Sequence, residues 1–193
     1  MPKIDSEKFY TSAIEMYGTT ARGVNWASQK NQRLRFQTIL KLLPDDLRLF
    51  TLADAGCGFG DFYSYLLKKR EGVGRYLGID NHIDMTSITA KKTAQEVLNA
   101  DICRDTLPKS DYYICSGALN VLTPFETRLF IANCYKSSKQ AFIFNVLHGD
   151  KESQTYNYLT TQKIKIIAQE LQVNKVVFES GYLEDDITVG FYR

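Results

Sequence analysis

The stretch Leu52-Ala53-Asp54-Ala55-Gly56-Cys57-Gly58-Phe59-Gly60-Asp61 decides the fold class of this 193-residue chain. An apolar-rich run begins at Leu47 and leads into it, and a helical pattern follows it to about Arg70. Gly56 and Gly58 permit a tight turn and let a ligand approach the backbone closely. The start of the following helix offers unpaired N–H groups to a carboxylate or phosphate. A glycine-rich turn between a strand and a helix predicts the first unit of an α/β sheet with a ligand at its carboxyl edge.

Strand and helix patterns alternate along the rest of the chain. Strand-like runs occupy residues 75–79, 97–100, 111–115, 141–147, 175–179 and 187–192. Helices are predicted from Asp84 as cap to about Val97, after the capping sequence Thr123-Pro124-Phe125-Glu126, and from Thr160 or Thr161. This alternation predicts a mostly parallel sheet covered on both faces. The last two strands have no helix between them, so we expect them to pair antiparallel.

Two helices are predicted ahead of the first strand. Asp5 or Ser6 can cap the first, which stops at Gly18, and Ser28 can cap the second, which Pro44 ends. We therefore predict an N-terminal helical extension over residues 1–46, covering the pocket of a ligand-binding domain over residues 47–193.

Composition narrows the classes of partner. There are 24 basic and 22 acidic residues, so the net charge of +2 is no strong signal for nucleic acid. The N-terminus lacks the apolar core of a signal peptide, and no apolar run approaches the roughly 20 residues that span a bilayer. Four widely spaced cysteines without a Cys-x-x-Cys pair predict free thiols and no metal site. We expect a cytoplasmic protein that does not bind a membrane.

Carboxylates follow successive predicted strands. Asp54 closes the first, Asp80 can accept hydrogen bonds from both hydroxyls of a ribose, and Asp101 can accept from an adenine amino group while Ile102 covers the ring. A dinucleotide site is the competing interpretation, but Asp61 stands where its third glycine belongs. A diphosphate would also be repelled by the carboxylates, whereas a cationic sulfonium tolerates them. The pattern favours S-adenosylmethionine over NAD.

The decisive stretch resembles the first motif of class I S-adenosylmethionine-dependent methyltransferases. Gly78-Ile79-Asp80 is similar to their ribose-binding strand end, Ala100-Asp101-Ile102 to their adenine-side motif, and residues 111–117 to their fourth strand. The resemblance covers about residues 48–193. It implies a Rossmann-like three-layer α/β sandwich with a mostly parallel seven-stranded sheet and an antiparallel last strand. It also implies S-adenosylmethionine as methyl donor, S-adenosylhomocysteine as product, and a place beneath the donor for Ser116 and Gly117.

A narrower likeness includes the N-terminal extension. Val24-Asn25-Trp26, followed by Ser28, Gln32, Arg35 and Phe36, resembles a bacterial and phage group of small methyltransferases, as do residues 116–121 and 144–147. This likeness implies that Arg35, helped by Gln32, lies near the carboxylate of the donor. It points to no particular acceptor.

Candidate residues for the acceptor each have a second interpretation. Trp26 lines the pocket or anchors its loop, and Tyr156 forms a lid or is an exposed loop tyrosine. Asn120 and Asn145 need a partner, which is backbone, donor or acceptor. His148 comes after the fifth strand as a possible general base or as a solvated loop histidine. In-line transfer from a sulfonium depends chiefly on proximity, so no catalytic residue is obligatory.

The residues after the fourth strand narrow the acceptor class. Ser116-Gly117-Ala118-Leu119 stands where methyltransferases acting on adenine or glutamine nitrogens have an Asn-Pro-Pro-Tyr-like tetrad. No cysteine comes directly after a proline, which disfavours a cytosine C5 nucleophile. We predict a small-molecule acceptor. The alternatives are an RNA or protein methyltransferase, a non-catalytic module that binds the donor or its product, and, third, a nicotinamide-linked oxidoreductase.

Overall fold

A computed structural model describes residues 11, 16, 18, 28–70 and 72–193. The expected first helix lies almost wholly outside this part of the chain, and Trp26 lies outside it entirely. Among the described residues, no helix is both long and apolar enough to cross a bilayer. The four cysteines are free thiols, as predicted.

The described chain contains one sheet of eight strands, in the order β3-β2-β1-β4-β5-β8-β7 with β6 paired to β5. The pairs are parallel except those of β8, which runs antiparallel to both β5 and β7. This confirms the mostly parallel sheet with an antiparallel last strand. The strands are β1 (Leu47–Ala55), β2 (Val73–Asp80), β3 (Glu96–Asn99), β4 (Ser110–Ser116), β5 (Ser138–His148), β6 (Tyr158–Leu159), β7 (Lys175–Ser180) and β8 (Asp186–Tyr192).

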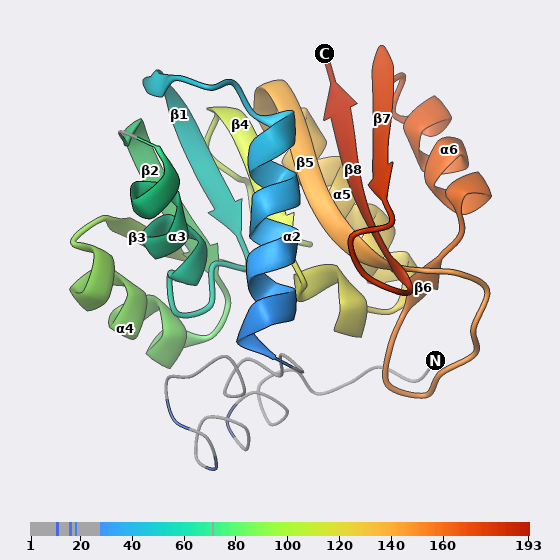
Figure 1. Cartoon of the computed structure of the whole chain (residues 1–193), viewed down its shortest axis with the longest axis horizontal. Coiled ribbons are helices and arrows are strands. Elements are labelled where there is room, and N and C mark those ends of the chain that lie inside the picture. Colours follow the sequence, from blue (N-terminus) through green and yellow to red (C-terminus); the bar gives the residue numbers. More distant parts are fainter. Residues whose placement is uncertain (1–10, 12–15, 17, 19–27, 71) are drawn as a thin grey trace.

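Helices cover both faces of the sheet and make three layers (Figure 1). They are α2 (Gln29–Leu42), α3 (Asp61–Lys69), α4 (Ile83–Thr93), the 3-10 helix η2 (Ala118–Val121), α5 (Pro124–Ser137) and α6 (Thr161–Glu170). One apolar cluster joins α2 and α3 to the sheet, and a second joins α5 and α6 to its other face. The two clusters take alternate residues of a strand: Ile114 of β4 belongs to the first, and its neighbours Tyr113 and Cys115 to the second.

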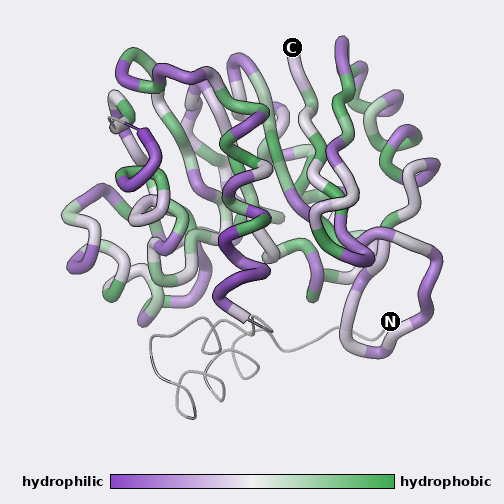
Figure 2. Tube along the Cα trace, viewed as in Figure 1, coloured by the Kyte–Doolittle hydropathy of each residue, from purple (hydrophilic) through white to green (hydrophobic). Residues whose placement is uncertain are grey.

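Both faces of the inner strands are therefore apolar, which explains their near-continuous hydrophobic runs. Figure 2 shows hydrophobic residues concentrated along the sheet, whereas hydrophilic residues prevail in the loop between β5 and β6. The sandwich buries its core between layers and leaves the carboxyl edge of the sheet available for a site.

Most predicted helix starts are confirmed. Thr123 and Glu126 form a reciprocal capping box at the start of α5, Ser28 caps α2, and Thr160 caps α6. The prediction that Asp84 caps the next helix is wrong. His82 is the N-cap of α4, and the helix ends at Thr93 instead of continuing to Val97. The helix stops early because residues 96–99 pair with β2 as strand β3.

Candidate functional site

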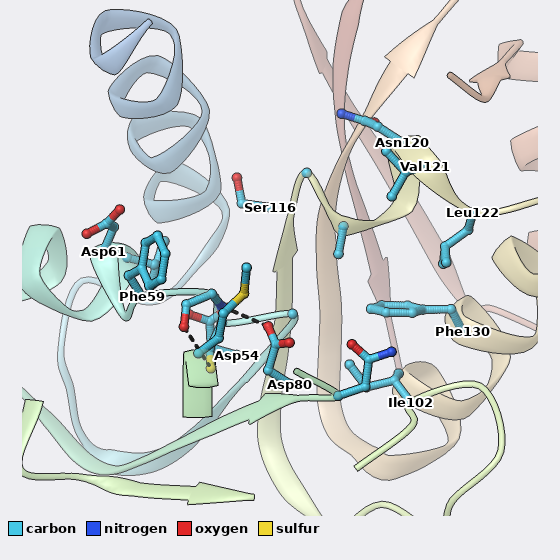
Figure 3. Close-up of a pocket in the computed structure, with 18 of the residues that line it drawn as sticks. Asp54, Phe59, Asp61, Asp80, Ile102, Ser116, Asn120, Val121, Leu122 and Phe130 are labelled. Carbon is cyan, nitrogen blue, oxygen red and sulfur yellow. Dashed lines mark hydrogen bonds between the residues drawn. The ribbon is translucent and has the colours of Figure 1, made fainter. Parts of the chain in front are cut away.

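A cavity opens at the carboxyl edge of the sheet, between the ends of β1 to β4 and helix α2 (Figure 3). All eleven residues expected to hold the donor line it: Gln32, Arg35, Asp54, Gly56, Gly58, Asp61, Asp80, Asp101, Ile102, Ser116 and Gly117. Two residues expected near the acceptor, Asn120 and Tyr156, line the same cavity. The fold thus brings together side chains from four strand ends and from the N-terminal extension.

The glycine turn after β1 is held against its neighbours by the backbone. The N–H groups of Gly56 and Cys57 donate to the carbonyl of Ile79 at 2.8 and 3.1 Å. Gly56 has φ +77°, and a Cβ at this position would lie 2.6 Å from the Cβ of Ala118. A larger residue would therefore separate this turn from η2. Glycine here lets the ends of β1, β2 and β4 converge on one cavity.

Asp80 organises the turn with its carboxylate. Its Oδ2 accepts from the N–H of Gly58 at 2.9 Å, and its Oδ1 accepts from the N–H of His82 at 3.0 Å. Burial raises the pKa of the Asp80 carboxyl, and these two backbone donors oppose that rise. Because a carboxylate oxygen accepts more than one hydrogen bond, Asp80 can still bind a pair of ligand hydroxyls.

Asp54, at the end of β1, is buried and bound to a side chain. The hydroxyl of Tyr76 donates to its Oδ2 at 2.7 Å. The pKa of Asp54 is raised to about 7, chiefly by burial. The hydrogen bond from Tyr76 opposes this rise, and the charges of Asp80 and Asp61 add to it. This carboxyl therefore changes charge near neutral pH, and a cation in the cavity would favour its ionised form.

Asp61 links the extension to the site. Its Oδ2 accepts from Nε2 of Gln32 at 3.1 Å, and its Oδ1 accepts from Nζ of Lys92 at 2.5 Å. It is the first residue of α3, whose N-cap, Gly60, has no side chain with which to cap the helix. The first N–H groups of α3 are therefore suited to an anionic group of a ligand.

Polar and apolar groups meet where β3 ends. Oδ1 of Asp101 accepts from the N–H of Cys103 at 2.9 Å and keeps further lone pairs for a ligand. The buried side chain of Ile102 lies beside it in the cavity wall (Figure 3). The apolar part of this wall also includes Ala100, Val121, Leu122 and Phe130. Such a wall fits a flat ring with one hydrogen-bonding edge.

Two expected site residues do not line the cavity. Asn145 is fully buried in β5 and binds the side chains of Ser116 and Thr188. His148 lies at the end of β5, where its Nε2 is 3.1 Å from Oγ1 of Thr161. Their predicted roles toward an acceptor stay predictions.

Several residues of the cavity wall are not among those that the sequence patterns predict. Asn81 directly follows Asp80, so its place after a strand end was a usable signal. The cavity residues Phe62, Met85 and Phe130 lie on helices, where their spacing is that of ordinary core positions. Such residues carry no local sign that they face a cavity.

Comparisons with known proteins support the fold described above. Family models find no match in the sequence, and a search of curated proteins finds none either. Among solved structures, magnesium protoporphyrin IX methyltransferase (ChlM) from Synechocystis PCC 6803 with bound S-adenosylmethionine is 15% identical. The match has a TM-score of 0.72 and covers 100% of this chain and 99% of that one.

Two further solved structures are similar. The pyocyanin biosynthetic protein PhzM is 15% identical with a TM-score of 0.69, covering 95% of this chain and 61% of that one. A putative methyltransferase in complex with the Trm112 activator of Haloferax volcanii gives 12% identity and a TM-score of 0.70, covering 94% and 96%. The chain therefore has the Rossmann-like fold of class I methyltransferases.

Proposed function

We propose that this protein is an S-adenosylmethionine-dependent methyltransferase whose methyl donor binds in the cavity at the carboxyl edge of the sheet. One observation carries the proposal: Asp54, Asp80 and Asp101, from three successive strand ends, line one cavity together with the glycine turn. The fold supports it, because ChlM, a methyltransferase with this fold, has been solved with the same donor bound.

The donor's adenosine fits one side of this cavity. The lone pairs that Asp80 retains accept from the ribose hydroxyls, and Asp101 accepts from the adenine amino group. Ile102 and Phe130 then lie against the ring. Adjacent ribose hydroxyls need two acceptors at fixed spacing, and Asp80 is held in place by two backbone N–H groups.

Charge separates this proposal from a dinucleotide site. Among the described residues that line the cavity, Arg35 is the one basic side chain, and Asp186 neutralises it in an ion pair. The same wall has four aspartates. Asp61 and Asp101 are paired with Lys92 and Arg104, which do not line the cavity. Asp54 and Asp80 accept hydrogen bonds from uncharged donors. A diphosphate would be repelled by such a wall, whereas a sulfonium is attracted.

The same charges favour a small-molecule acceptor over RNA, because RNA-binding surfaces need basic residues to neutralise phosphates. Two proteins of similar fold support this class: ChlM is a magnesium protoporphyrin IX methyltransferase, and PhzM is a pyocyanin biosynthetic protein. The acceptor's nucleophile attacks the methyl carbon in line, the carbon–sulfur bond breaks, and S-adenosylhomocysteine leaves as a neutral thioether. His148 serves as a base only if the acceptor extends beyond the residues that line the cavity.

The extension takes part in this proposal. Helix α2 supplies Gln32 and Arg35 to the cavity wall, so we assign to residues 1–46 the role of a pocket cover.

Calorimetric titration tests donor binding. The protein should bind S-adenosylmethionine and not NAD, and Asp80→Asn should weaken donor binding about 100-fold through two impaired charge-assisted hydrogen bonds. Asp84→Asn, an exposed carboxylate on α4, is the matched control and should bind normally. Preference for NAD, or equal binding by Asp80→Asn, would contradict the proposal.

Transfer of a radiolabelled methyl group then tests the acceptor class. The protein is incubated with labelled donor and a cell extract separated into low-mass, RNA and protein fractions. Label in the low-mass fraction supports the proposal. Label in RNA or protein would establish the alternative acceptor class. Donor binding without transfer to any fraction would identify a binding module.

A further inference from the structure

A line of polar side chains crosses the sheet beside the cavity. Ser116 of β4, Asn145 of β5 and Thr188 of β8 are neighbours in register on adjacent strands. Oγ of Ser116 donates to Oδ1 of Asn145 at 2.8 Å, and Nδ2 of Asn145 donates to Oγ1 of Thr188 at 2.5 Å. Ser116 lines the cavity, whereas Asn145 and Thr188 are fully buried.

The line continues to a buried ion pair. Oγ1 of Thr188 donates to the hydroxyl oxygen of Tyr182 at 2.8 Å, and that hydroxyl donates to Oδ1 of Asp186 at 2.5 Å. Oδ2 of Asp186 accepts from Nε of Arg35 at 2.5 Å. Arg35 comes from α2, which packs against β4, β5 and β8, and it lines the cavity as Ser116 does. The chain of hydrogen bonds therefore begins and ends in the wall of one cavity.

The carboxylate of Asp186 fixes the direction in which protons are donated along this chain of hydrogen bonds. A carboxylate only accepts hydrogen bonds, so Tyr182 must donate to it, and Thr188 must donate to Tyr182. The hydroxyl proton of Ser116 is committed to Asn145 at the other end, which leaves Ser116 only lone pairs for the cavity. Burial raises the pKa of the Asp186 carboxyl, and the Arg35 guanidinium opposes this and favours the ionised form.

The line of polar side chains begins at the same level of the sheet as the cavity. Two residues earlier on the same strands, Ile114 and Ile143 point to the same face of the sheet and pack in the apolar cluster beneath α2. Apolar residues would often stabilise such positions as well as a buried ion pair and its hydrogen bonds do. The change from isoleucine to serine and asparagine thus coincides with the place where a ligand would lie. Figure 3 shows Ser116 on the α2 side of the cavity.

We propose that Asp186 is a positioning residue for the amino-acid end of the methyl donor. Through the hydrogen-bonded chain it makes Ser116 an acceptor for the donor's α-ammonium group, and through the ion pair it holds Arg35 beside the α-carboxylate. This inference rests on the proposed function. It assigns a role to the last strand, which touches the cavity only through other residues.

Two ligands separate a positioning role from a merely structural one. S-adenosylhomocysteine carries the amino-acid group, and 5′-methylthioadenosine has the same nucleoside and thioether without it. Calorimetry measures both ligands on the whole protein and on Ser116→Ala and Asp186→Asn. The amide of Asp186→Asn can donate to Tyr182 and reverse the chain, so that Ser116 would direct its proton at the ammonium. Both variants should bind S-adenosylhomocysteine roughly tenfold more weakly or worse, as expected for one charge-assisted hydrogen bond, and bind 5′-methylthioadenosine within about twofold of wild type.

Tyr192→Phe is the matched control. Its hydroxyl also lies on β8 and also anchors α2, by donating to the carbonyl of Leu42 at 2.7 Å, but it takes no part in the chain. It should change neither affinity. If Asp186→Asn fails to fold, Tyr182→Phe cuts the chain while keeping the ion pair, and should weaken only S-adenosylhomocysteine, about threefold or more.

The outcomes are distinct. Parallel loss of both ligands in the variants, or no loss of either, would overturn the role of Asp186 and leave the proposed function standing. A wild-type protein that binds neither ligand would overturn both. Selective loss of S-adenosylhomocysteine, with normal binding by Tyr192→Phe, supports the inference.

Discussion

The two walls of the cavity are built by different means. The wall at the ends of β1, β2 and β3 holds its carboxylates mainly with backbone N–H groups close in space to the turn, as Gly58 and His82 hold Asp80. The wall at β4 and α2 depends on side chains bonded to side chains, with Arg35 and Asp186 paired across 151 residues of sequence. The first wall depends on the pairing of β1, β2 and β3, which are consecutive strands in the sequence. The second wall exists only once the two ends of the described chain have packed together.

This difference predicts unequal sensitivity to substitution, and Arg35→Met should show the largest effect. It leaves the carboxylate of Asp186 buried without its cation, which costs about 3–5 kcal/mol of unfolding free energy. Urea unfolding measures the loss. On the first wall, Asp101→Asn changes a half-exposed carboxylate and should cost under about 1 kcal/mol.

The double variant Arg35→Met with Asp186→Leu is the control, because it removes both charges. It should recover most of the stability that Arg35→Met loses. If Arg35→Met lost no more than Asp101→Asn, the second wall would not depend on its ion pair, and the contrast between the walls would fail.

The same contrast explains how far the sequence predicts the site. Asp54, Asp80 and Asp101 each come after a strand-like run, and parallel strands bring their carboxyl ends to one edge, so their convergence is a consequence of topology. The sequence indicates that Asn145 is a polar residue in need of a partner, but the identity of its partners, Ser116 and Thr188, depends on strand order and register. Tyr182 and Asp186 carried no local signal, because their roles arise from contact with a helix at the other end of the chain.

The differences between the predicted and the observed helices and strands have similar causes. The two-residue strand β6 is too short to leave a periodic pattern, and it forms because the loop after β5 returns to the sheet. Asp84 is of a residue type that often caps helices. The N–H of His82 is bound to Asp80, however, and His82 is the residue that caps α4. In both places tertiary contacts overrode local preference.

A second prediction concerns Asp54, the carboxylate of the first wall that a side chain holds. Its pKa rises from an ordinary 3.8 to about 7 in the folded protein. As pH rises from about 4 to 7, the unfolded chain releases this proton before the folded protein does, so stability falls over that range. Asp54→Asn should therefore be more stable than wild type at pH 8, by on the order of 2 kcal/mol, with a much smaller difference at pH 4.

Ligand binding should show the opposite trend with pH. Ionised Asp54 attracts a sulfonium, so affinity for S-adenosylmethionine should rise through pH 7 more steeply than affinity for the neutral thioether S-adenosylhomocysteine. The difference should vanish in Asp54→Asn. Equal pH profiles for both ligands in wild type would mean that Asp54 does not sense the donor's charge, and that the first wall acts through hydrogen bonds alone.

An effect smaller than those of Arg35→Met and Asp54→Asn is expected at Thr123, which belongs to neither wall. Its side chain accepts from the N–H of Glu126 and completes the capping box of α5. Thr123→Ala should cost about 1 kcal/mol of unfolding free energy, and Thr123→Ser should cost less because it keeps the hydroxyl. Neither should change the affinity for the donor. Because the neighbouring Leu122 lines the cavity, a loss of affinity in Thr123→Ala that Thr123→Ser restores would show that the start of α5 shapes the apolar part of the site. That part would then depend, as the second wall does, on contacts made away from the ligand.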